Sequence, residues 1–169
     1  VGGSLGSQRI NEFVTDHLDV FAAENLQVLW QCGKIYYDRY QSLASEQVKI
    51  LKFISKMDLA YAAADVIISR AGAGAVSELS LVGKPVIFIP SPNVAEDHQT
   101  QNAKSIQDKN AAIMLKESNL DDEFEPVFKN LINDAQLRNQ LSKNILKLAK
   151  PQATQTIVDE VERLETLLK

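Results

Sequence analysis

Short apolar runs alternate along the chain with segments in which apolar residues recur every three or four positions. The runs are rich in Val, Ile, Leu and Phe, and most of them do not alternate with polar residues. This pattern predicts strands that are buried on both faces, as in a parallel sheet. The expected strands are residues 27–31, 48–53, 65–69, 85–89 and 111–115, with Val1 as the tail of a further strand.

The segments between these runs have helical periodicity, and some carry recognisable end signals. Gly83, followed by a proline, is the expected C-cap of one helix, and Asp134 is the expected N-cap of another. From about residue 121 onward the chain reads as helices only. The other expected helices are residues 7–23, 57–64, 74–82 and 97–109.

Alternation of strands and helices predicts an α/β fold with a doubly wound, mostly parallel, Rossmann-like sheet. The 169 residues fit one domain. In such a sheet, ligands bind outside the carboxyl ends of the strands. The loops at that edge are therefore the first places to look for function.

Composition excludes several classes of protein. The chain has 18 Lys and Arg against 22 Asp and Glu, a net charge of −4, which argues against a general nucleic-acid binder. A single cysteine, Cys32, excludes a disulfide framework and a Cys-rich zinc site. No cluster of metal ligands is recognisable, and no apolar run approaches the ~20 residues that span a bilayer. Because the chain opens on a glycine-rich turn without Met, we expect a fragment of a larger protein.

The first glycine-rich turn contains Gly2, Gly3 and Gly6. Glycines between a strand and a helix allow positive φ and let a ligand approach the backbone, while the helix N-terminus favours a phosphate. Ser4 and Ser7 add hydroxyl donors. The alternative is a tight turn with a serine cap.

A second turn of the same kind follows the strand at residues 65–69. Its small residues, Gly72, Ala73, Gly74 and Ala75, leave room for a ligand against bare backbone. Two such turns in one small domain are more informative than one. They favour a ligand that contains phosphate.

Two charged residues flank the second turn. The carboxylate of Glu78 can accept hydrogen bonds from both hydroxyls of a ribose, or it can complement the helix dipole. For Arg70 we expect an internal structural role rather than a phosphate contact.

Two further loops lie at the same edge. Within residues 91–102, His98 and Gln99 are suited to sugar hydroxyls, and Asp97 to a helix N-cap. In the other loop, Phe53 could pack on a flat base while backbone groups of Ile54 read its edge. The alternative for Phe53 is a place in the core.

Common nucleotide motifs are missing. The first turn does not match G-x-G-x-x-G, and the second strand ends in Gln31 and Cys32 with no carboxylate for an adenosine ribose, which disfavours NAD. Neither Gly-Lys pair is part of a P-loop, since Ile35 and Pro85 follow them.

The combined motifs V-G-G-S-L-G-S (1–7), F-I-x-x-M (53–57), A-D-V-I-I-S-R-A-G-A (64–73), S-E (77–78) and D-H-Q-T-x-N-A (97–103) resemble the carboxyl-terminal half of the MurG family. This family comprises N-acetylglucosaminyltransferases of bacterial peptidoglycan synthesis. The resemblance covers nearly the whole chain. It implies a two-domain GT-B glycosyltransferase in which residues 1–169 form the UDP-N-acetylglucosamine (UDP-GlcNAc) binding domain and the amino-terminal acceptor domain is absent.

The resemblance also assigns parts of the donor to these segments. It implies that Ser4 and the turns with Gly2, Gly3, Gly6 and Gly72 meet the diphosphate, and that uracil lies at Phe53 and Ile54. Met57, in the same motif, is implied to be a substrate-binding residue. The resemblance further implies that Ala73, Gly74 and Ala75 line the phosphate and sugar, that Glu78 holds the ribose, and that His98 and Gln99 reach the GlcNAc hydroxyls. Leu5, Gly74 and Ala75 depart from residues common in the family.

The implied reaction is metal-independent, cofactor-free, inverting transfer of GlcNAc from UDP-GlcNAc to lipid I, which gives lipid II. We expect no catalytic residue in this chain and no transferase activity from it alone. The implied location is peripheral, on the cytoplasmic side of the bacterial inner membrane. Two alternatives remain: a stand-alone, non-catalytic donor-binding subunit of a two-part transferase, and a UDP-GlcNAc 2-epimerase.

Overall fold

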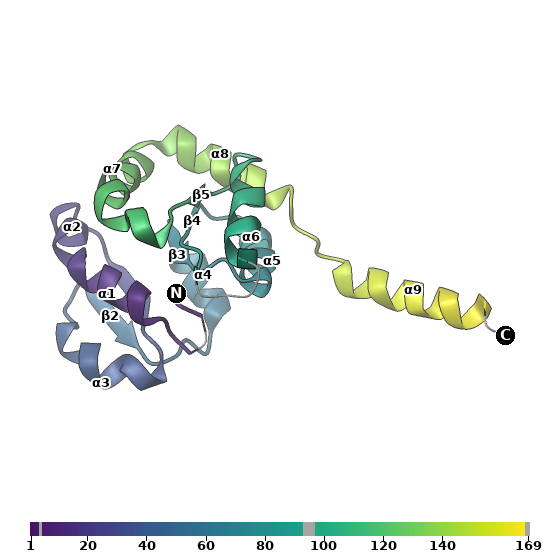
Figure 1. Cartoon of the computed structure of the whole chain (residues 1–169), viewed down its shortest axis with the longest axis horizontal. Helices are drawn as coiled ribbons and strands as arrows, with labels where there is room; N and C mark the ends of the chain where they lie inside the picture. Colours follow the sequence, from purple (N-terminus) through teal and green to yellow (C-terminus); the bar gives the residue numbers. More distant parts are fainter. Residues whose placement is uncertain (4, 93–96, 168–169) are drawn as a thin grey trace.

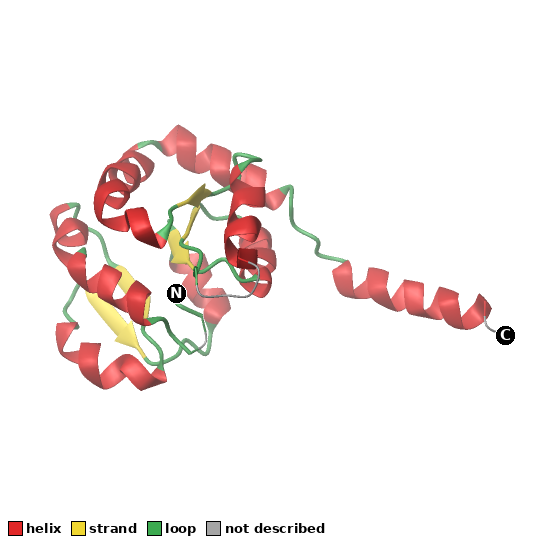
Figure 2. Ribbon diagram, in the orientation of Figure 1, coloured by secondary structure: helices red, strands yellow, loops and turns green. Residues whose placement is uncertain are grey.

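The computed structural model describes residues 1–3, 5–92 and 97–167, in which helices and strands alternate (Figures 1 and 2). The strands are β1 (Val28–Gln31), β2 (Val48–Leu51), β3 (Ile67–Ser69), β4 (Val86–Phe88) and β5 (Ile113–Met114). The helices are α1 (Gln8–Asp16), α2 (Leu18–Ala23), α3 (Tyr37–Tyr40), α4 (Met57–Ala63), α5 (Ala73–Val82), α6 (His98–Gln107), α7 (Leu120–Asn133), α8 (Ala135–Leu146) and α9 (Ala153–Leu167). Short 3-10 turns cover Lys34–Tyr36, Gln41–Leu43 and Glu117–Asn119.

All the paired strands run parallel, which confirms the predicted α/β fold with a parallel sheet. They form two sheets, β1 with β2 and β3-β4-β5. Val28 of β1 lies opposite Val48, and Ile67 of β3 lies opposite Val86. Each predicted strand is present, with ends within three residues of those expected.

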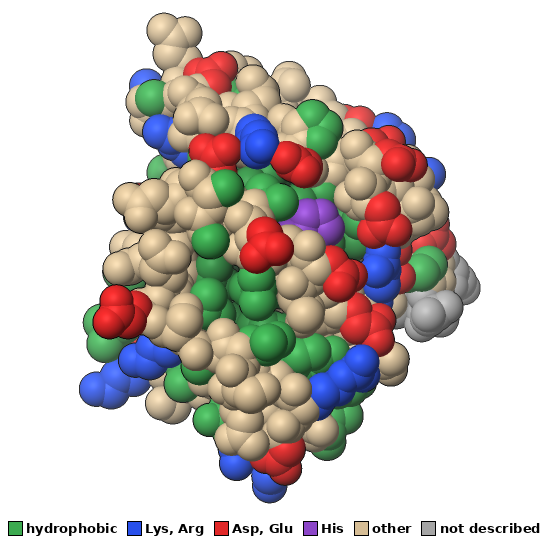
Figure 3. Space-filling view, turned by 90° about the vertical axis from the view of Figure 1, so that its left-hand side faces the viewer, with side chains coloured by type: hydrophobic (Ala, Val, Ile, Leu, Met, Phe, Trp, Pro, Cys, Tyr) green, Lys and Arg blue, Asp and Glu red, His purple; other side chains and the backbone are tan. Residues whose placement is uncertain are grey.

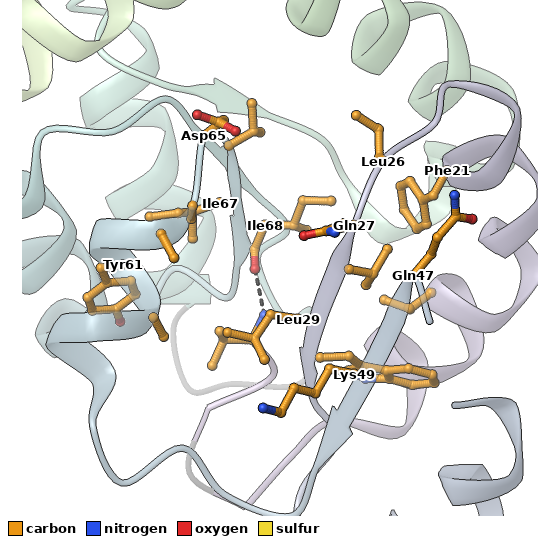
Figure 4. A pocket seen from close by; sticks show the side chains of 18 of the residues that line it. Phe21, Leu26, Gln27, Leu29, Gln47, Lys49, Tyr61, Asp65, Ile67 and Ile68 are labelled. Carbon is orange, nitrogen blue, oxygen red and sulfur yellow. Dashed lines mark hydrogen bonds between the residues drawn. The ribbon is translucent and has the colours of Figure 1, made fainter. Parts of the chain in front are cut away.

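Val1 lies beside the free edge of β3. Its nitrogen donates to the Ile68 carbonyl at 2.6 Å (Figure 4). Its carbonyl accepts from the Arg70 nitrogen at 3.3 Å, which completes the pattern of a parallel strand pair. A cavity of about 830 Å³ separates β1 from β3. Apolar side chains such as Leu29 and Ile67 line much of it (Figure 4).

Helices bury both faces of the β3-β4-β5 sheet. In β4, Val86 and Phe88 face one cluster of buried residues while Ile87 faces another, and all three are fully buried. One cluster joins β4 to α1, α2, α7 and β1, and the other joins it to α5, α6 and α8. Figure 3 shows hydrophobic side chains gathered in a hollow of the face it presents, with charged side chains around it. Burial on both faces explains why the strands read as continuous apolar runs.

Two helix caps predicted from sequence are confirmed. Gly83 adopts the left-handed conformation (φ 69°) and ends α5. The Asp134 side chain accepts hydrogen bonds from the nitrogens of Gln136 and Leu137 at the start of α8.

The expected helices at 57–64, 74–82 and 97–109 are confirmed within two residues, and one predicted helix was wrong. The helix expected at 7–23 is broken at His17, whose Nδ1 lies 2.8 Å from the Phe13 carbonyl oxygen and whose ring contacts Phe124. This local bond and ring contact accompany a backbone (φ −112°, ψ 10°) that interrupts the helix. Helix α3 was not predicted, since four residues offer little periodicity. Helix α9 extends away from the rest of the molecule (Figure 1), with Ile157 and Val161 exposed.

Candidate nucleotide-binding site

The first glycine turn packs its backbone tightly against the loop after β1. Gly6 has φ 81°, and a Cβ there would lie 2.1 Å from the Cys32 carbonyl oxygen. Gly33 (φ 92°) packs equally closely against the Leu5 carbonyl. Gly3 also has positive φ, but no atom of the described residues beyond its chain neighbours lies within 4 Å of a Cβ built there. The turn is therefore fixed on one side and accessible on the other; Ser4 lies outside the described residues.

Ser7 and Arg70 tie the two glycine turns together. Ser7 Oγ accepts from the Ile10 nitrogen as the N-cap of α1, and it also accepts from Arg70 Nη2 at 2.7 Å. Arg70 Nη1 donates to the Ile89 carbonyl at 3.1 Å, and its guanidinium forms an ion pair with Glu117. These internal contacts give Arg70 the structural role expected from the sequence.

The second turn exposes the N-terminus of α5. Gly72 is the N-cap, and the first backbone bond inside the helix runs from the Val76 nitrogen to the Gly72 carbonyl. In the part of the chain that the structure describes, the N–H groups of Ala73, Gly74 and Ala75 have no hydrogen-bond partner. Among the described residues, none beyond the chain neighbours and the helix's own backbone has an atom within 4 Å of a Cβ built on Gly72 or Gly74. Open space in front of unpaired donors and a helix dipole suits a phosphate.

Glu78 lies on the second turn of α5 with its carboxylate exposed. Its Oε2 accepts a hydrogen bond of 3.2 Å from the Tyr61 hydroxyl of α4. Burial, together with the charge and hydrogen bond of Glu78, raises the pKa of Tyr61 to about 12. Tyr61 therefore stays a neutral donor that holds Glu78. Tyr61 could not be predicted from the sequence, because nothing local marks its position opposite Glu78.

The loop after β2 divides into an exposed and a buried part. The Phe53 side chain is 58% exposed, so it is free to pack on a ligand, and it does not belong to the core. Ile54 is buried, and its N–H donates to Gln31 Oε1 at 2.7 Å. That N–H is therefore engaged inside the protein. Met57 is half-buried at the start of α4.

Helix α6 begins near the second turn. Asp97, at the N-cap position, has φ 51° and its side chain makes no capping bond. His98 is exposed at the first position of the helix, and Gln99 Oε1 accepts from the Ser91 nitrogen at 3.0 Å. Asn102 Nδ2 donates to the Ala71 carbonyl at 3.1 Å, which joins α6 to the second turn.

Internal hydrogen bonds thus connect the predicted segments at one edge of the sheets. The cavity between β1 and β3 is lined mainly by apolar residues and is poorly suited to a diphosphate, but it borders the candidate site, because Ile54, Met57 and Tyr61 also line it. Among the described residues, no group of three His, Cys, Asp or Glu side chains could hold a metal ion. Within the same stretches, none of the helices has the length and apolarity to cross a bilayer.

Comparisons with known proteins agree with this architecture. The chain is 57% identical over 165 residues to the UDP-N-acetylglucosamine–N-acetylmuramyl-(pentapeptide) pyrophosphoryl-undecaprenol N-acetylglucosamine transferase of Flavobacterium psychrophilum, covering 97% of the chain and 45% of the relative. It is 48% identical over 161 residues to the enzyme of the same name from Cytophaga hutchinsonii, covering 95% and 44%. The chain thus spans just under half the length of these relatives.

The crystal structure of Acinetobacter baumannii MurG is similar over 96% of this chain and 48% of that one, with a TM-score of 0.81 and 33% identity. The sequence profile of the glycosyltransferase family 28 C-terminal domain matches residues 1–161. The chain belongs to the glycosyltransferase family 28 C-terminal domain family.

Proposed function

We propose that this chain binds UDP-GlcNAc at the carboxyl edge of its sheets and acts as the donor-binding domain of an N-acetylglucosaminyltransferase. The observation that carries the proposal is the row of N–H groups at Ala73, Gly74 and Ala75, which have no partner among the described residues and begin the helix that carries Glu78. The names of the relatives, which are N-acetylglucosamine transferases, support the choice of donor.

In this proposal, the diphosphate lies between the two glycine turns. The turn with Gly3 contributes backbone, and the α5 N-terminus contributes N–H donors and a positive dipole end. Glu78 accepts from the ribose hydroxyls with the lone pairs that Tyr61 leaves free. Phe53 packs on the uracil, and His98 and Gln99 lie toward the sugar. The site assignments of Ser4, Ile54 and Met57 also remain predictions.

The chemistry needs little from these residues beyond binding and electrostatics. The 4-hydroxyl of the muramoyl acceptor attacks C1 of GlcNAc, and the bond from C1 to the phosphate oxygen breaks. Negative charge then builds on the departing UDP, next to the α5 N-terminus, which stabilises it. The proton of the attacking hydroxyl is taken by a group outside this chain.

In this proposal, the acceptor and the membrane are contacted by the rest of the transferase and not by this chain. The relatives' names describe an acceptor built on pyrophosphoryl-undecaprenol, a polyprenyl lipid. We therefore extend the proposal to a peripheral enzyme on the cytoplasmic side of the bacterial inner membrane, with lipid I held by a second domain.

Calorimetric titration of the chain with UDP-GlcNAc, UDP-glucose and ADP tests the proposal. We expect UDP-GlcNAc to bind most tightly and ADP not to bind measurably. Equal affinity for ADP would contradict a uridine site. A transfer assay with UDP-GlcNAc and lipid I should show no turnover by this chain alone, and sustained turnover would contradict the need for a second domain.

A further inference from the structure

Gln31 ends β1 and is 1% exposed, yet both ends of its amide are paired with backbone groups from different loops. Its Nε2 donates to the Gly3 carbonyl in the first glycine turn at 3.0 Å. Its Oε1 accepts from the Ile54 nitrogen, in the loop after β2, at 2.7 Å. The partners fix the orientation of the amide, because a carbonyl only accepts and a backbone N–H only donates.

This one side chain therefore links the first glycine turn to the loop after β2. The Gly3 turn is also held by backbone packing of Gly6 against Cys32, by the hydrogen bond from Arg70 to Ser7, and by the pairing of Val1 with β3. None of these contacts reaches the loop after β2. In the described part of the chain, the Gly3 carbonyl accepts one further bond, from the Gly6 nitrogen of the same turn. Gln31 thus provides the hydrogen bond that joins the Gly3 carbonyl to another part of the fold.

We propose that Gln31 is a positioning residue that aligns the phosphate-binding turn at Gly3 with the base-binding loop at Phe53 and Ile54, so that both parts of a uridine diphosphate bind together. This inference rests on the proposed function. It assigns Gln31 no direct contact with the ligand. We expect Gln31 to affect how much more tightly the chain binds UDP than uridine.

Two substitutions separate this role from a general effect on folding. Gln31→Met has a similar volume and removes both hydrogen bonds. Gln31→Glu keeps an acceptor for the Ile54 nitrogen at high pH but sets a carboxylate against the Gly3 carbonyl. At low pH, the protonated carboxyl has an O–H that donates to Gly3 and restores both bonds. Burial raises the pKa of a carboxyl, which brings this change into an accessible range.

The experiment measures the Kd of uridine and of UDP by NMR titration at pH 8.5 and pH 5.5, for the wild type and each variant. The quantity compared is the Kd of uridine divided by the Kd of UDP. At pH 8.5 we expect this ratio to be at least tenfold smaller in Gln31→Glu than in the wild type, while the Kd of uridine changes less than threefold. At pH 5.5 the ratio should return to within threefold of the wild type. In Gln31→Met the ratio should be at least tenfold smaller than in the wild type at both pH values. Gln140→Glu, on the exposed face of α8, is the matched control.

Each outcome decides one question. If wild-type chain binds neither ligand, the proposed function fails before Gln31 is tested. If wild-type chain binds, the inference is overturned by an unchanged ratio, by equal losses for uridine and UDP, or by no recovery of Gln31→Glu at pH 5.5. Thermal unfolding of each variant shows whether a loss of affinity merely follows a loss of fold.

Discussion

The Tyr61 hydroxyl donates a 3.2 Å hydrogen bond to Oε2 of Glu78, joining α4 to α5 beside the exposed N-terminus of α5. The two residues are 17 positions apart. Tyr61 occupies one acceptor site of the carboxylate and restricts its rotation. The remaining lone pairs of Glu78 are available to a ligand.

Glu78→Ala should weaken binding of UDP-GlcNAc by about 1–3 kcal/mol, roughly five- to 160-fold, because hydrogen bonds to a charged group are lost. Calorimetric titration measures this change. Glu162→Gln on exposed α9 controls for the loss of one negative charge. An unchanged Kd in Glu78→Ala would remove Glu78 from the ribose site.

Tyr61→Phe should change the pH dependence of stability at alkaline pH. The pKa of Tyr61 is raised from 10.0 to about 12 in the folded chain, so the folded state holds this proton more tightly than the unfolded state. The stabilisation is complete below pH 10 and is lost as the pH rises toward 12. Urea unfolding at pH 9 and pH 11 should show a steeper decline for wild type than for Tyr61→Phe. Parallel declines would contradict the assigned pKa.

Gly74→Ala should raise the stability of the fold and weaken the binding of UDP. Gly74 lies inside α5, and alanine favours a helix over glycine by up to about 1 kcal/mol. Beyond the chain neighbours and the helix backbone, its methyl group would meet no atom of the described residues within 4 Å, and it would lie in the first turn of α5, where we place the diphosphate. We expect a higher urea midpoint together with at least tenfold weaker binding of UDP. The exposed helix substitution Asn139→Ala should raise stability without changing the Kd, and unweakened binding in Gly74→Ala would place the phosphate elsewhere.

Gly6→Ala should destabilise the fold strongly, by about 3 kcal/mol or more, since it combines a left-handed φ with a clash against the Cys32 carbonyl. Gly3→Ala is the matched variant, because it has a similar φ of 85° but open space around it. Only the conformational term of about 1–2 kcal/mol applies there. Urea unfolding compares the two. Equal losses of stability would contradict the close packing of Gly6.

The strands could be predicted from sequence because burial on both faces leaves a continuous apolar run such as residues 85–89. The two helix caps could be predicted equally well, because Gly83 and Asp134 interact with residues close to them in sequence. The break at His17 is accompanied by a ring contact with Phe124, more than 100 residues away, which the local sequence pattern could not predict.

The candidate site was predictable in part. Glycine turns at strand ends point to backbone donors, and the structure leaves those at Ala73 to Ala75 unpaired in its described residues. The roles of Gln31 and Tyr61 depend on which loops the fold brings together. No spacing along the chain announces that Gln31 reaches both Gly3 and Ile54.

The most direct test is a crystal structure of this chain with UDP-GlcNAc. The account predicts phosphate oxygens within hydrogen-bond distance of the Ala73, Gly74 and Ala75 nitrogens, with the ribose at Glu78. A nucleotide lodged in the cavity between β1 and β3, or anywhere away from the α5 N-terminus, would contradict it.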